Sequence, residues 1–564
     1  MQTWTTMMRQ IPTINGLGGT AQSMTGFLPD FNELPLAAQV AQMLVVRASG
    51  YLFDHQIRYP DWEPPAHTLQ YWVETLGVGG VILLGGSAGE VLLRTHQLQD
   101  WATIPLLMAA DVEEGVGQRF AGATWFPPPM ALAAIAQQNL DLALHYAAEM
   151  GAVTAQEARA IGLNWVLAPV VDVNNNSENP VINVRAFGET VDVVQRLAIA
   201  FLQGAHRFPV LTVAKHFPGH GDTAVDSHLE LPVLSHSLER LQTVEFPPFQ
   251  TAIAAGVDAI MSAHLQIPAL DATYPATLSD RVLTQLLRRD WGFSGLITTD
   301  ALVMGAIANR YGANEAAVLA IEAGADILLM PADPEGAIQA VCAAVDAGRI
   351  AADQILASVE RIWHAKQRVC APTLSGATSH TWETITPTIQ PHLFTADLAR
   401  PESLTLVDEM VQRSLTLHRP APLAVPTPEH PARNLIVVDD ALSADGLGTH
   451  TPAIALPAQR GYQLQIVDRH TADLPPQQWQ QHAPTLLQLF IRGNPFRGSA
   501  GLTQTAAQWF EFLLTTRQLQ AIALYGSPYI LDRFVAHLPP DIPYVFSYGQ
   551  MPQAQAIALR ALWD

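Results

Sequence analysis

The sequence predicts an α/β protein in which a (β/α)8 TIM-type barrel is followed by an α/β sandwich domain. From about Leu34 to Val369, short apolar runs alternate with longer amphipathic ones. The candidate strands are apolar throughout rather than alternating, which is typical of a parallel sheet buried on both faces. Eight such strand–helix units over about 330 residues fit a barrel of this type.

The predicted elements follow one another in the order that a barrel requires. Strands are expected at Met43–Arg47, Val78–Leu84, Pro105–Asp111, Leu163–Val170, Val210–Phe217, Ala259–His264, Gly295–Leu302 and Asp326–Ala332. Helices are expected between them at Ala88–Thr103, Met130–Gly162, Val191–Arg207, Ser279–Trp291 and Asn314–Gly324.

The composition of the chain changes after Cys370. Residues 1–30 are expected to form an N-terminal extension, 31–370 the barrel, 371–400 a linker rich in Thr, Pro and Ser, and 401–564 the second domain. That domain is expected to hold helices at Leu404–Leu417 and Gln504–Thr515 and strands at Asn434–Val438, Leu486–Ile491 and Ile522–Tyr525. It has no GxGxxG or Walker pattern, so a nucleotide-binding role is not expected.

Composition excludes several classes of protein. Of the 564 residues, 49% are hydrophobic and 14% charged, which supplies large cores and excludes intrinsic disorder. With 51 acidic and 30 basic residues the formal net charge is -21, which disfavours nucleic acid and anionic membranes as partners. No signal peptide and no apolar run of membrane-spanning length are evident, so we expect a cytoplasmic protein without membrane insertion.

The two cysteines, Cys342 and Cys370, fall in predicted helices. We expect reduced, packed side chains, because no CxxC or Cys/His spacing supports a disulfide or a metal site.

Ionisable residues stand at the ends of four predicted barrel strands. Strand three ends on Asp111, strand five on Lys215 and His216, strand six on His264 and strand seven on Asp300. Each could simply meet solvent or cap the next helix. Active sites of such barrels form at the C-terminal ends of the strands. The four strand ends therefore also predict a polar pocket suited to a hydroxylated ligand.

The densest polar stretch is the loop from Lys215 to His228, with three His, two Asp and one Lys beside Pro and Gly. A metal site is one interpretation, but the spacing matches no familiar zinc pattern, so neither a metal nor a cofactor is expected. Asp226 and His228 suggest another interpretation. A carboxylate bonded to one imidazole nitrogen fixes the tautomer and leaves the other nitrogen to carry a proton.

Asp300 lies in an apolar stretch, where an unpaired carboxylate would be costly to bury. It is either the N-cap of the following helix or a carboxylate at the floor of a pocket, as attack on the anomeric carbon of a sugar requires.

Four segments together resemble glycoside hydrolase family 3. They are Asp111–Phe120, Asn179–Glu189, Lys215–His228 and the Thr-Thr-Asp-Ala-Leu-Val-Met run around Asp300. They are most similar to the β-N-acetylhexosaminidase (NagZ-type) branch, which acts in peptidoglycan recycling. The resemblance covers the barrel with its motifs in order, and Tyr525–Tyr529 is similar to a strand-to-helix turn of the family's second domain.

The resemblance implies a role for eight side chains. Asp300 would be the nucleophile and His228 the general acid/base oriented by Asp226, while the ligands of the sugar hydroxyls would be Asp111, Arg119, Arg185, Lys215 and His216. The activity implied is that of a retaining, exo-acting β-N-acetylglucosaminidase with a covalent glycosyl-aspartate intermediate. One departure is Glu114, where the family has glycine, so the local backbone or a neighbouring subsite is expected to differ.

Three alternatives stay open. The first is a β-glucosidase of the same family, against which the Asp226-Ser227-His228 loop speaks. The second is a β-N-acetylglucosaminide phosphorylase, because a neutral histidine base repels phosphate less than a carboxylate does. The third is a carbohydrate-binding protein with an inactive barrel, which predicts loss of Asp300 or His228. The expected partner is a small glycoside or oligosaccharide. The second domain is expected to serve packing or a homodimer interface, and the alternative is that its turn Arg492–Arg497 reaches the mouth of the barrel.

Overall fold

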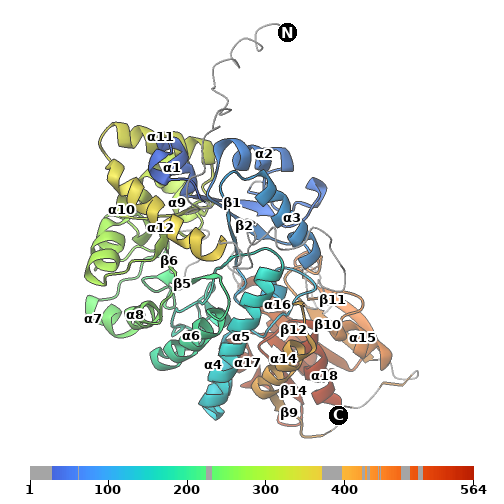
Figure 1. Cartoon of the computed structure of the whole chain (residues 1–564). Helices are drawn as coiled ribbons and strands as arrows, with labels where there is room; N and C mark the ends of the chain where they lie inside the picture. The colour runs from blue at the N-terminus through green and yellow to red at the C-terminus, as the bar shows by residue number, and fades with distance from the viewer. Residues whose placement is uncertain are drawn as a thin grey trace.

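The computed structural model contains a barrel and a smaller sheet domain beside it (Figure 1). It describes residues 28–60, 62–223, 231–370, 397–421, 423, 426–427, 432–442, 444, 446–471, 483–492 and 500–564, with the side chains of 500–502 excepted. Asp226, His228 and most of the predicted N-terminal extension and linker lie outside the described residues.

Eight parallel strands form the barrel, at the places that the apolar runs predict. They are β1 (Leu44–Ser49), β2 (Gly80–Leu84), β3 (Leu107–Ala110), β4 (Trp165–Val166), β5 (Leu211–Phe217), β6 (Ala259–Ser262), β7 (Leu296–Thr298) and β8 (Leu328–Leu329). They pair in chain order from β1 to β7, and β1 also pairs with β8. A parallel bridge between Thr298 and Ile327 closes the ring, so the loops after the strands share one rim.

Helices cover the outside of this ring (Figure 1). They are α1 (Leu36–Gln42), α2 (Ala66–Tyr71), α3 (Ala88–Trp101), α4 (Met130–Gln138), α5 (Leu140–Ala160), α6 (Val191–Ala205), α7 (Leu238–Arg240), α8 (Phe246–Ala254), the π-helix η8 (Arg281–Asp290), α9 (Gly305–Tyr311), α10 (Ala313–Ala323), α11 (Pro334–Asp346) and α12 (Ala352–Cys370). Strands β1, β5 and β6 are buried along their whole length, which explains their continuous apolar sequence.

The predicted helix Met130–Gly162 is wrong in one respect, because it is two helices. Asn139 separates α4 from α5 with an extended backbone (φ -156°, ψ 99°). Its side-chain oxygen accepts a hydrogen bond from the amide of Leu142 at 3.1 Å. Asparagine is a favoured N-cap residue, so it can end one helix and start the next within an uninterrupted apolar pattern.

The C-terminal domain is built on a six-stranded sheet in the order β11-β10-β12-β13-β14-β9. Its elements are α14 (Pro401–Ser414), β9 (Thr416–His418), β10 (Ala432–Val437), α15 (Pro452–Gln459), β11 (Tyr462–Val467), β12 (Thr485–Ile491), α16 (Ala500–Thr515), β13 (Leu519–Gly526), α17 (Pro528–Val535), β14 (Tyr544–Ser547) and α18 (Pro552–Trp563). The helix predicted to reach Leu417 ends at Ser414, because residues 416–418 pair antiparallel with β14.

Helices lie on both faces of this sheet, which confirms the predicted α/β sandwich. Successive residues of β10 point to opposite faces. Ile436 belongs to an apolar cluster with side chains of α15 and α18, whereas Leu435 and Val437 belong to one with side chains of α16 and α17.

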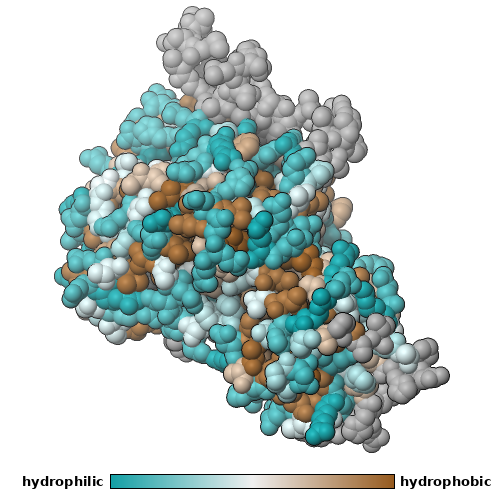
Figure 2. Space-filling view, turned by 90° about the horizontal axis from the view of Figure 1, so that it is seen from below, coloured by the Kyte–Doolittle hydropathy of each residue, from teal (hydrophilic) through white to brown (hydrophobic). Residues whose placement is uncertain are grey.

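The two domains touch through helices as well as loops. Helix α14 packs against α4, and the hydroxyl of Tyr146 in α5 donates to Oε2 of Glu409 in α14 at 2.8 Å. The space-filling view shows the two lobes, each with apolar patches surrounded by polar residues on this face (Figure 2).

Both cysteines lie in helices and are free, Cys342 half-buried in α11 and Cys370 buried in α12, as predicted. Among the described helices none has both the length and the apolar character that a membrane span needs.

Candidate functional site

The loops after β3, β4, β5 and β7 carry the predicted site residues to one rim of the barrel. Asp111 follows β3 directly, Arg185 lies in the long segment after β4, Lys215 and His216 lie in β5, and Asp300 follows β7. The peptide bond between Lys215 and His216 is cis. Since the strands are parallel, these residues all face the end of the barrel where such folds bind ligands.

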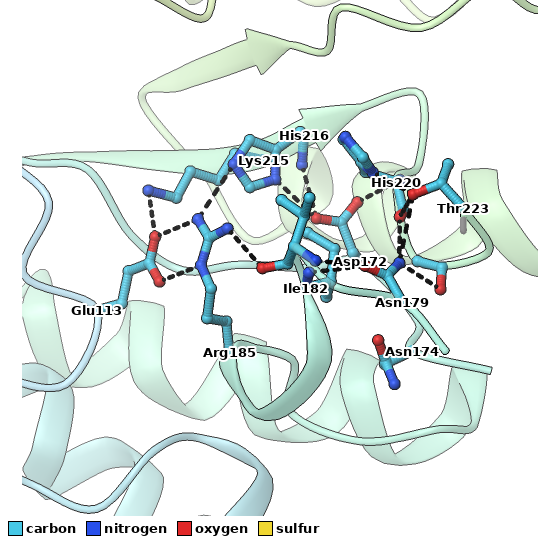
Figure 3. Close-up of polar contacts among 12 residues, drawn as sticks. Glu113, Asp172, Asn174, Asn179, Ile182, Arg185, Lys215, His216, His220 and Thr223 are labelled. Carbon is cyan, nitrogen blue, oxygen red and sulfur yellow. Dashed lines mark hydrogen bonds and ion pairs between the residues drawn. The ribbon is translucent and has the colours of Figure 1, made fainter. Parts of the chain in front are cut away.

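Asp111, Glu113, Arg185 and Lys215 form a charged cluster, of which Figure 3 shows the last three. The ammonium of Lys215 lies 2.7 Å from Oδ1 of Asp111 and 2.5 Å from Oε1 of Glu113. Arg185 contacts both carboxylate oxygens of Glu113, through Nε and Nη2, at 2.8 Å each. Lys215 and Glu113 are buried, whereas the side chains of Asp111 and Arg185 are 28% and 17% exposed. The latter two are therefore open to a ligand.

The cluster fixes its own charges. Burial would raise the pKa of Glu113, but Arg185 and Lys215 outweigh it and hold that pKa well below its usual range. Burial would lower the pKa of Lys215, but Asp111 and Glu113 raise it. Glu113 likewise outweighs burial and raises the pKa of Arg185. The two cations and the carboxylate of Glu113 thus present permanent donors and acceptors, as polar recognition of hydroxyl groups needs.

A second network lies beside the first and is centred on Asp172 (Figure 3). One carboxylate oxygen of Asp172 lies 2.8 Å from Nδ1 of His216 and accepts its backbone amide at 3.1 Å. The other oxygen accepts the amide of His220 at 2.7 Å. Nε2 of His216 is 3.4 Å from Nη2 of Arg185, a donor. In the neutral form of the His216 ring, these partners place the proton on Nδ1 and leave Nε2 as an acceptor.

The protonation of Asp172 and His220 follows from the same network. Burial would raise the pKa of Asp172, but its hydrogen bond and attraction to His216 lower it. Burial, and then the neighbouring His216, lower the pKa of His220 to about 4. Asp172 is thus an anion at neutral pH and His220 is neutral.

Asp300 is not the N-cap of the following helix. That helix, α9, begins at Gly305 with Met304 as its N-cap. The half-buried carboxylate of Asp300 instead accepts the amide of Ala301 at 2.7 Å. The carbonyl of Ala301 lies 3.0 Å from Nε2 of His264, a fully buried side chain. The cap interpretation is therefore wrong. His264, two residues after β6, holds the backbone beside Asp300 in place.

The segment that carries Arg185 is held in place by Asn179. The amide nitrogen of Asn179 donates to the carbonyls of His220 and Gly221 at 2.8 and 2.9 Å, and its oxygen accepts the amides of Val181 and Ile182. This buried side chain ties the segment after β4 to the loop after β5. Such a network keeps Arg185 oriented before a ligand arrives.

Two further residues after β3, Arg119 and Glu114, lie beside the charged cluster rather than within it. Nε of Arg119 donates to the backbone carbonyl of Asp111 at 3.0 Å, so Arg119 lies at the edge of the cluster. Glu114 is 1% exposed and points to the C-terminal domain, where it pairs with Arg492. Nε1 of Trp125 donates to it at 3.1 Å. Arg492 thus reaches the barrel rim, and the chain that follows it, 493–499, lies outside the described residues.

The structure brings together the five predicted ligand residues, Asp111, Arg119, Arg185, Lys215 and His216. Asp226 and His228 lie outside the described residues. Sequence reasoning did not single out three members of the two networks, Glu113, Asp172 and His220. Asp172 stands two residues beyond the predicted fourth strand, so a wider reading of the strand-end pattern would have found it.

One group elsewhere in the described residues has the donor atoms for a metal ion. Ligand atoms of Asp440, Asp468 and His470 lie within 4.8 Å of one another in the C-terminal domain. However, Arg469 already pairs with Asp440, and Thr471 donates to Asp468 at 3.0 Å. These contacts satisfy the carboxylates without an ion.

Comparisons with known proteins agree with this geometry. Residues 36–365 match the profile of the "Glycosyl hydrolase family 3 N terminal domain", and residues 426–564 that of the "Bacterial Glycosyl hydrolase family 3 C-terminal domain". The chain is a glycoside hydrolase and belongs to family 3.

Individual relatives are similar over about half or nearly all of the chain. "Beta-hexosaminidase A" of Pseudoalteromonas piscicida is 37% identical over 276 residues, which is 45% of this chain and 46% of that protein. "Beta-hexosaminidase" of Nitrosomonas eutropha is 36% identical over 283 residues, covering 48% of this chain and 81% of that protein. The solved family 3 β-N-acetylglucosaminidase of Paenibacillus sp. str. FPU-7 is 29% identical with a TM-score of 0.71, covering 94% of this chain and 96% of that one.

Proposed function

We propose that the chain is a retaining, exo-acting β-N-acetylglucosaminidase that releases terminal β-linked N-acetylglucosamine. The observation that carries the proposal is the charged cluster after β3, β4 and β5, on the same rim as Asp300. Relatives named beta-hexosaminidase support the choice of an N-acetylamino sugar. The solved relative that matches along nearly the whole chain is a β-N-acetylglucosaminidase, which supports it as well.

In the proposed mechanism Asp300 attacks the anomeric carbon while His228 gives a proton to the leaving oxygen. The product of this step is a glycosyl ester of Asp300. Neutral His228 then takes a proton from water, the water oxygen attacks the anomeric carbon, and the ester bond breaks to restore the carboxylate. Asp226 orients His228 and stabilises its charged form.

The charged cluster supplies the binding part of this proposal. Asp111 and Arg185 are the partly exposed members, so they contact the sugar hydroxyls first. Lys215 lies behind them with His216, and Arg119 lies at the edge. Charge-assisted hydrogen bonds of this kind hold a sugar in one orientation, which brings its anomeric carbon to Asp300.

The test compares hydrolysis of an aryl β-N-acetylglucosaminide and an aryl β-glucoside by the full chain. We expect at least a tenfold preference in kcat/KM for the first. Asp300→Asn should lower kcat by about three orders of magnitude or more, because a covalent nucleophile is lost. The matched control Asp353→Asn changes an exposed aspartate in the first turn of α12 and should retain full activity. Near-normal rates in Asp300→Asn would refute the nucleophile, and a glucoside preference would refute the substrate class.

His228 requires its own test, because a general acid matters less for a good leaving group. His228→Ala should lose more activity on chitobiose than on the aryl glycoside. Equal losses on both substrates would refute the acid role. Comparing turnover in phosphate and in a non-nucleophilic buffer at the same pH separates hydrolysis from phosphorolysis, since only the latter forms a sugar 1-phosphate.

We further propose fragments of peptidoglycan as the natural substrates and the cytoplasm as the site of action. The basis is the branch that the motifs of the Asp226–His228 loop resemble. A tenfold or higher kcat/KM for a muropeptide fragment than for chitobiose is the expected result. The opposite order would favour chitin oligosaccharides.

A further inference from the structure

We propose that the C-terminal domain positions the charged cluster of the barrel through two side chains, Arg492 and Tyr529. Arg492 reaches the loop after β3, which carries Asp111 and Glu113. Tyr529 reaches the segment after β4, which carries Arg185. The inference rests on the proposed function, because it gives both side chains a part in shaping the same sugar site.

Arg492 is the first residue after β12, and its guanidinium meets the carboxylate of Glu114 with two nitrogens. Nη1 lies 3.2 Å from Oε2, and Nη2 contacts Oε1. The side chains of Arg492 and Glu114 are 21% and 1% exposed. A two-nitrogen contact to a buried carboxylate fixes both the distance and the orientation of the loop that carries it.

Glu114 follows Glu113 directly, and the two side chains serve opposite sides of one loop. Glu113 points to Arg185 and Lys215, while Glu114 points to the C-terminal domain. Without Arg492, the buried carboxylate of Glu114 would lose its cationic partner and keep neutral donors such as Nε1 of Trp125. The loop would then lose the contact that fixes its position, and Glu113 would move with it.

Tyr529 lies in the first turn of α17 and joins the two ends of the segment after β4. Its hydroxyl accepts from Nδ2 of Asn174 at 2.8 Å and donates to Oε1 of Glu189 at 2.7 Å. The oxygen of Asn174 in turn accepts the amide of Asn183 at 2.9 Å. Asn183 has a left-handed backbone (φ 45°) and opens the single 3-10 turn that ends at Arg185. A single hydroxyl thus supports the backbone from which Arg185 projects.

The hydroxyl of Tyr529 can be removed without losing the apolar contact around its ring. Burial, and then Glu189, raise the pKa of Tyr529, so the hydroxyl remains a donor over the working pH range. The ring packs against a cluster that includes Val181, Ile182 and Val184. Tyr529→Phe keeps this packing and removes the two hydrogen bonds, together with the weak 4.0 Å contact of the hydroxyl with Sδ of Met130.

The experiment measures KM and kcat on the aryl β-N-acetylglucosaminide and the Kd of free N-acetylglucosamine for each full-length variant. Tyr529→Phe should raise KM and Kd about threefold to tenfold and Arg492→Ala about tenfold or more, with a smaller effect on kcat. Arg492→Lys keeps the charge but loses the two-nitrogen contact, so its KM and Kd should lie between those of the wild type and Arg492→Ala.

Two control variants break contacts between the same domains away from the cluster. Tyr146→Phe removes the hydroxyl that donates to Glu409 in α14. Arg533→Ala removes an ion pair with Glu178 at 2.5 Å. Glu178 lies in the segment after β4, but the two side chains are 51% and 64% exposed, so this pair contributes little to its position. Both should change KM and Kd less than twofold, whatever they do to the melting temperature. Controls as impaired as Tyr529→Phe and Arg492→Ala would show general loss of domain packing and overturn the proposal.

Hydrogen exchange of the free protein tests the proposal without any substrate. In Tyr529→Phe, amides of residues 174–189 should exchange at least threefold faster, and in Arg492→Ala the same should hold for residues 112–119. If the wild type does not hydrolyse the N-acetylglucosaminide but the two variants show these exchange changes, the proposed function alone is refuted. Unchanged exchange together with unchanged KM and Kd would refute the positioning role alone.

Discussion

Lys215 and Glu113 form an ion pair at 2.5 Å although their side chains are only 1% and 3% exposed. Two such buried charges are costly to remove from water unless each has enough partners. Here Lys215 also meets Asp111, and Glu113 also meets Arg185. The shared contacts make the cluster a unit, so a change at one member should disturb the others.

Glu113→Gln is expected to damage the cluster more than its conservative size suggests. The amide keeps the shape of the side chain but leaves Arg185 and Lys215 with one carboxylate fewer. We expect kcat/KM to fall about a hundredfold, because displaced ligands misplace the sugar, and the free energy of unfolding to fall by about 3 kcal/mol. Steady-state kinetics and urea unfolding measure the two effects.

The control for this change is Glu149→Gln, which weakens a pair between Glu149 and Arg207 whose side chains are 33% and 50% exposed. Exposed pairs contribute about 0–1 kcal/mol, so stability and kcat/KM should stay close to wild type. A Glu113→Gln enzyme as active as this control would contradict the role assigned to the cluster.

Asp172→Asn should alter how the stability of the fold depends on pH. The pKa of Asp172 is lower in the folded chain than the usual 3.8. A carboxyl with a depressed pKa stabilises the fold above its unfolded value and loses that contribution as the pH falls through the folded value. The variant should therefore be less stable than wild type at pH 6, and the gap should narrow below pH 4. A gap that stays constant between pH 6 and pH 3 would contradict the prediction.

His220 should make the stability of the fold depend on pH in a higher range than Asp172 does. Its folded pKa is about 4, against a usual value of 6.5. Between these values the unfolded chain binds the extra proton, so stability rises with pH, by about 3 kcal/mol in total. His220→Gln should remove this part of the rise between pH 4 and 6.5. Urea unfolding at pH 4.5, 5.5 and 7 measures the free energy of unfolding. If it rises equally with pH in the wild type and in His220→Gln, the prediction is disproved.

The sequence predicted the barrel well because its strands are buried on both faces and read as plain apolar runs. It failed where one polar residue or a partner strand distant in the sequence decides the local backbone. Asn139 caps α5 within an otherwise helical pattern, and residues 416–418 become a strand only because β14 lies beside them. The first effect depends on one side-chain hydrogen bond and the second on a partner more than a hundred residues away in the sequence.

The residues of the site likewise divide into those that a sequence pattern predicts and those that it does not. Asp111, Lys215 and Asp300 could be predicted, because they end apolar strands in a barrel whose strand ends meet at one rim. Arg185 was placed in the site only by resemblance, since nothing local in its sequence shows that it meets Glu113. The turn that begins at Arg492 could be proposed to reach the barrel mouth, but its partner Glu114 could not be predicted, because the contact joins two domains.

Lys366 supplies a prediction far from the charged cluster. It is fully buried in α12, and its ammonium donates to Oε1 of Gln42 at 2.6 Å. Burial lowers its pKa from 10.5 to about 7, so the unfolded chain binds more protons between these values and stability rises with pH there, by up to about 5 kcal/mol. Lys366→Met fills the same space without a charge and should remove this rise, although it leaves the oxygen of Gln42 without that donor. Urea unfolding at pH 7 and pH 9.5 measures the change, and a variant whose stability rises as steeply as that of the wild type would show that Lys366 keeps its proton throughout.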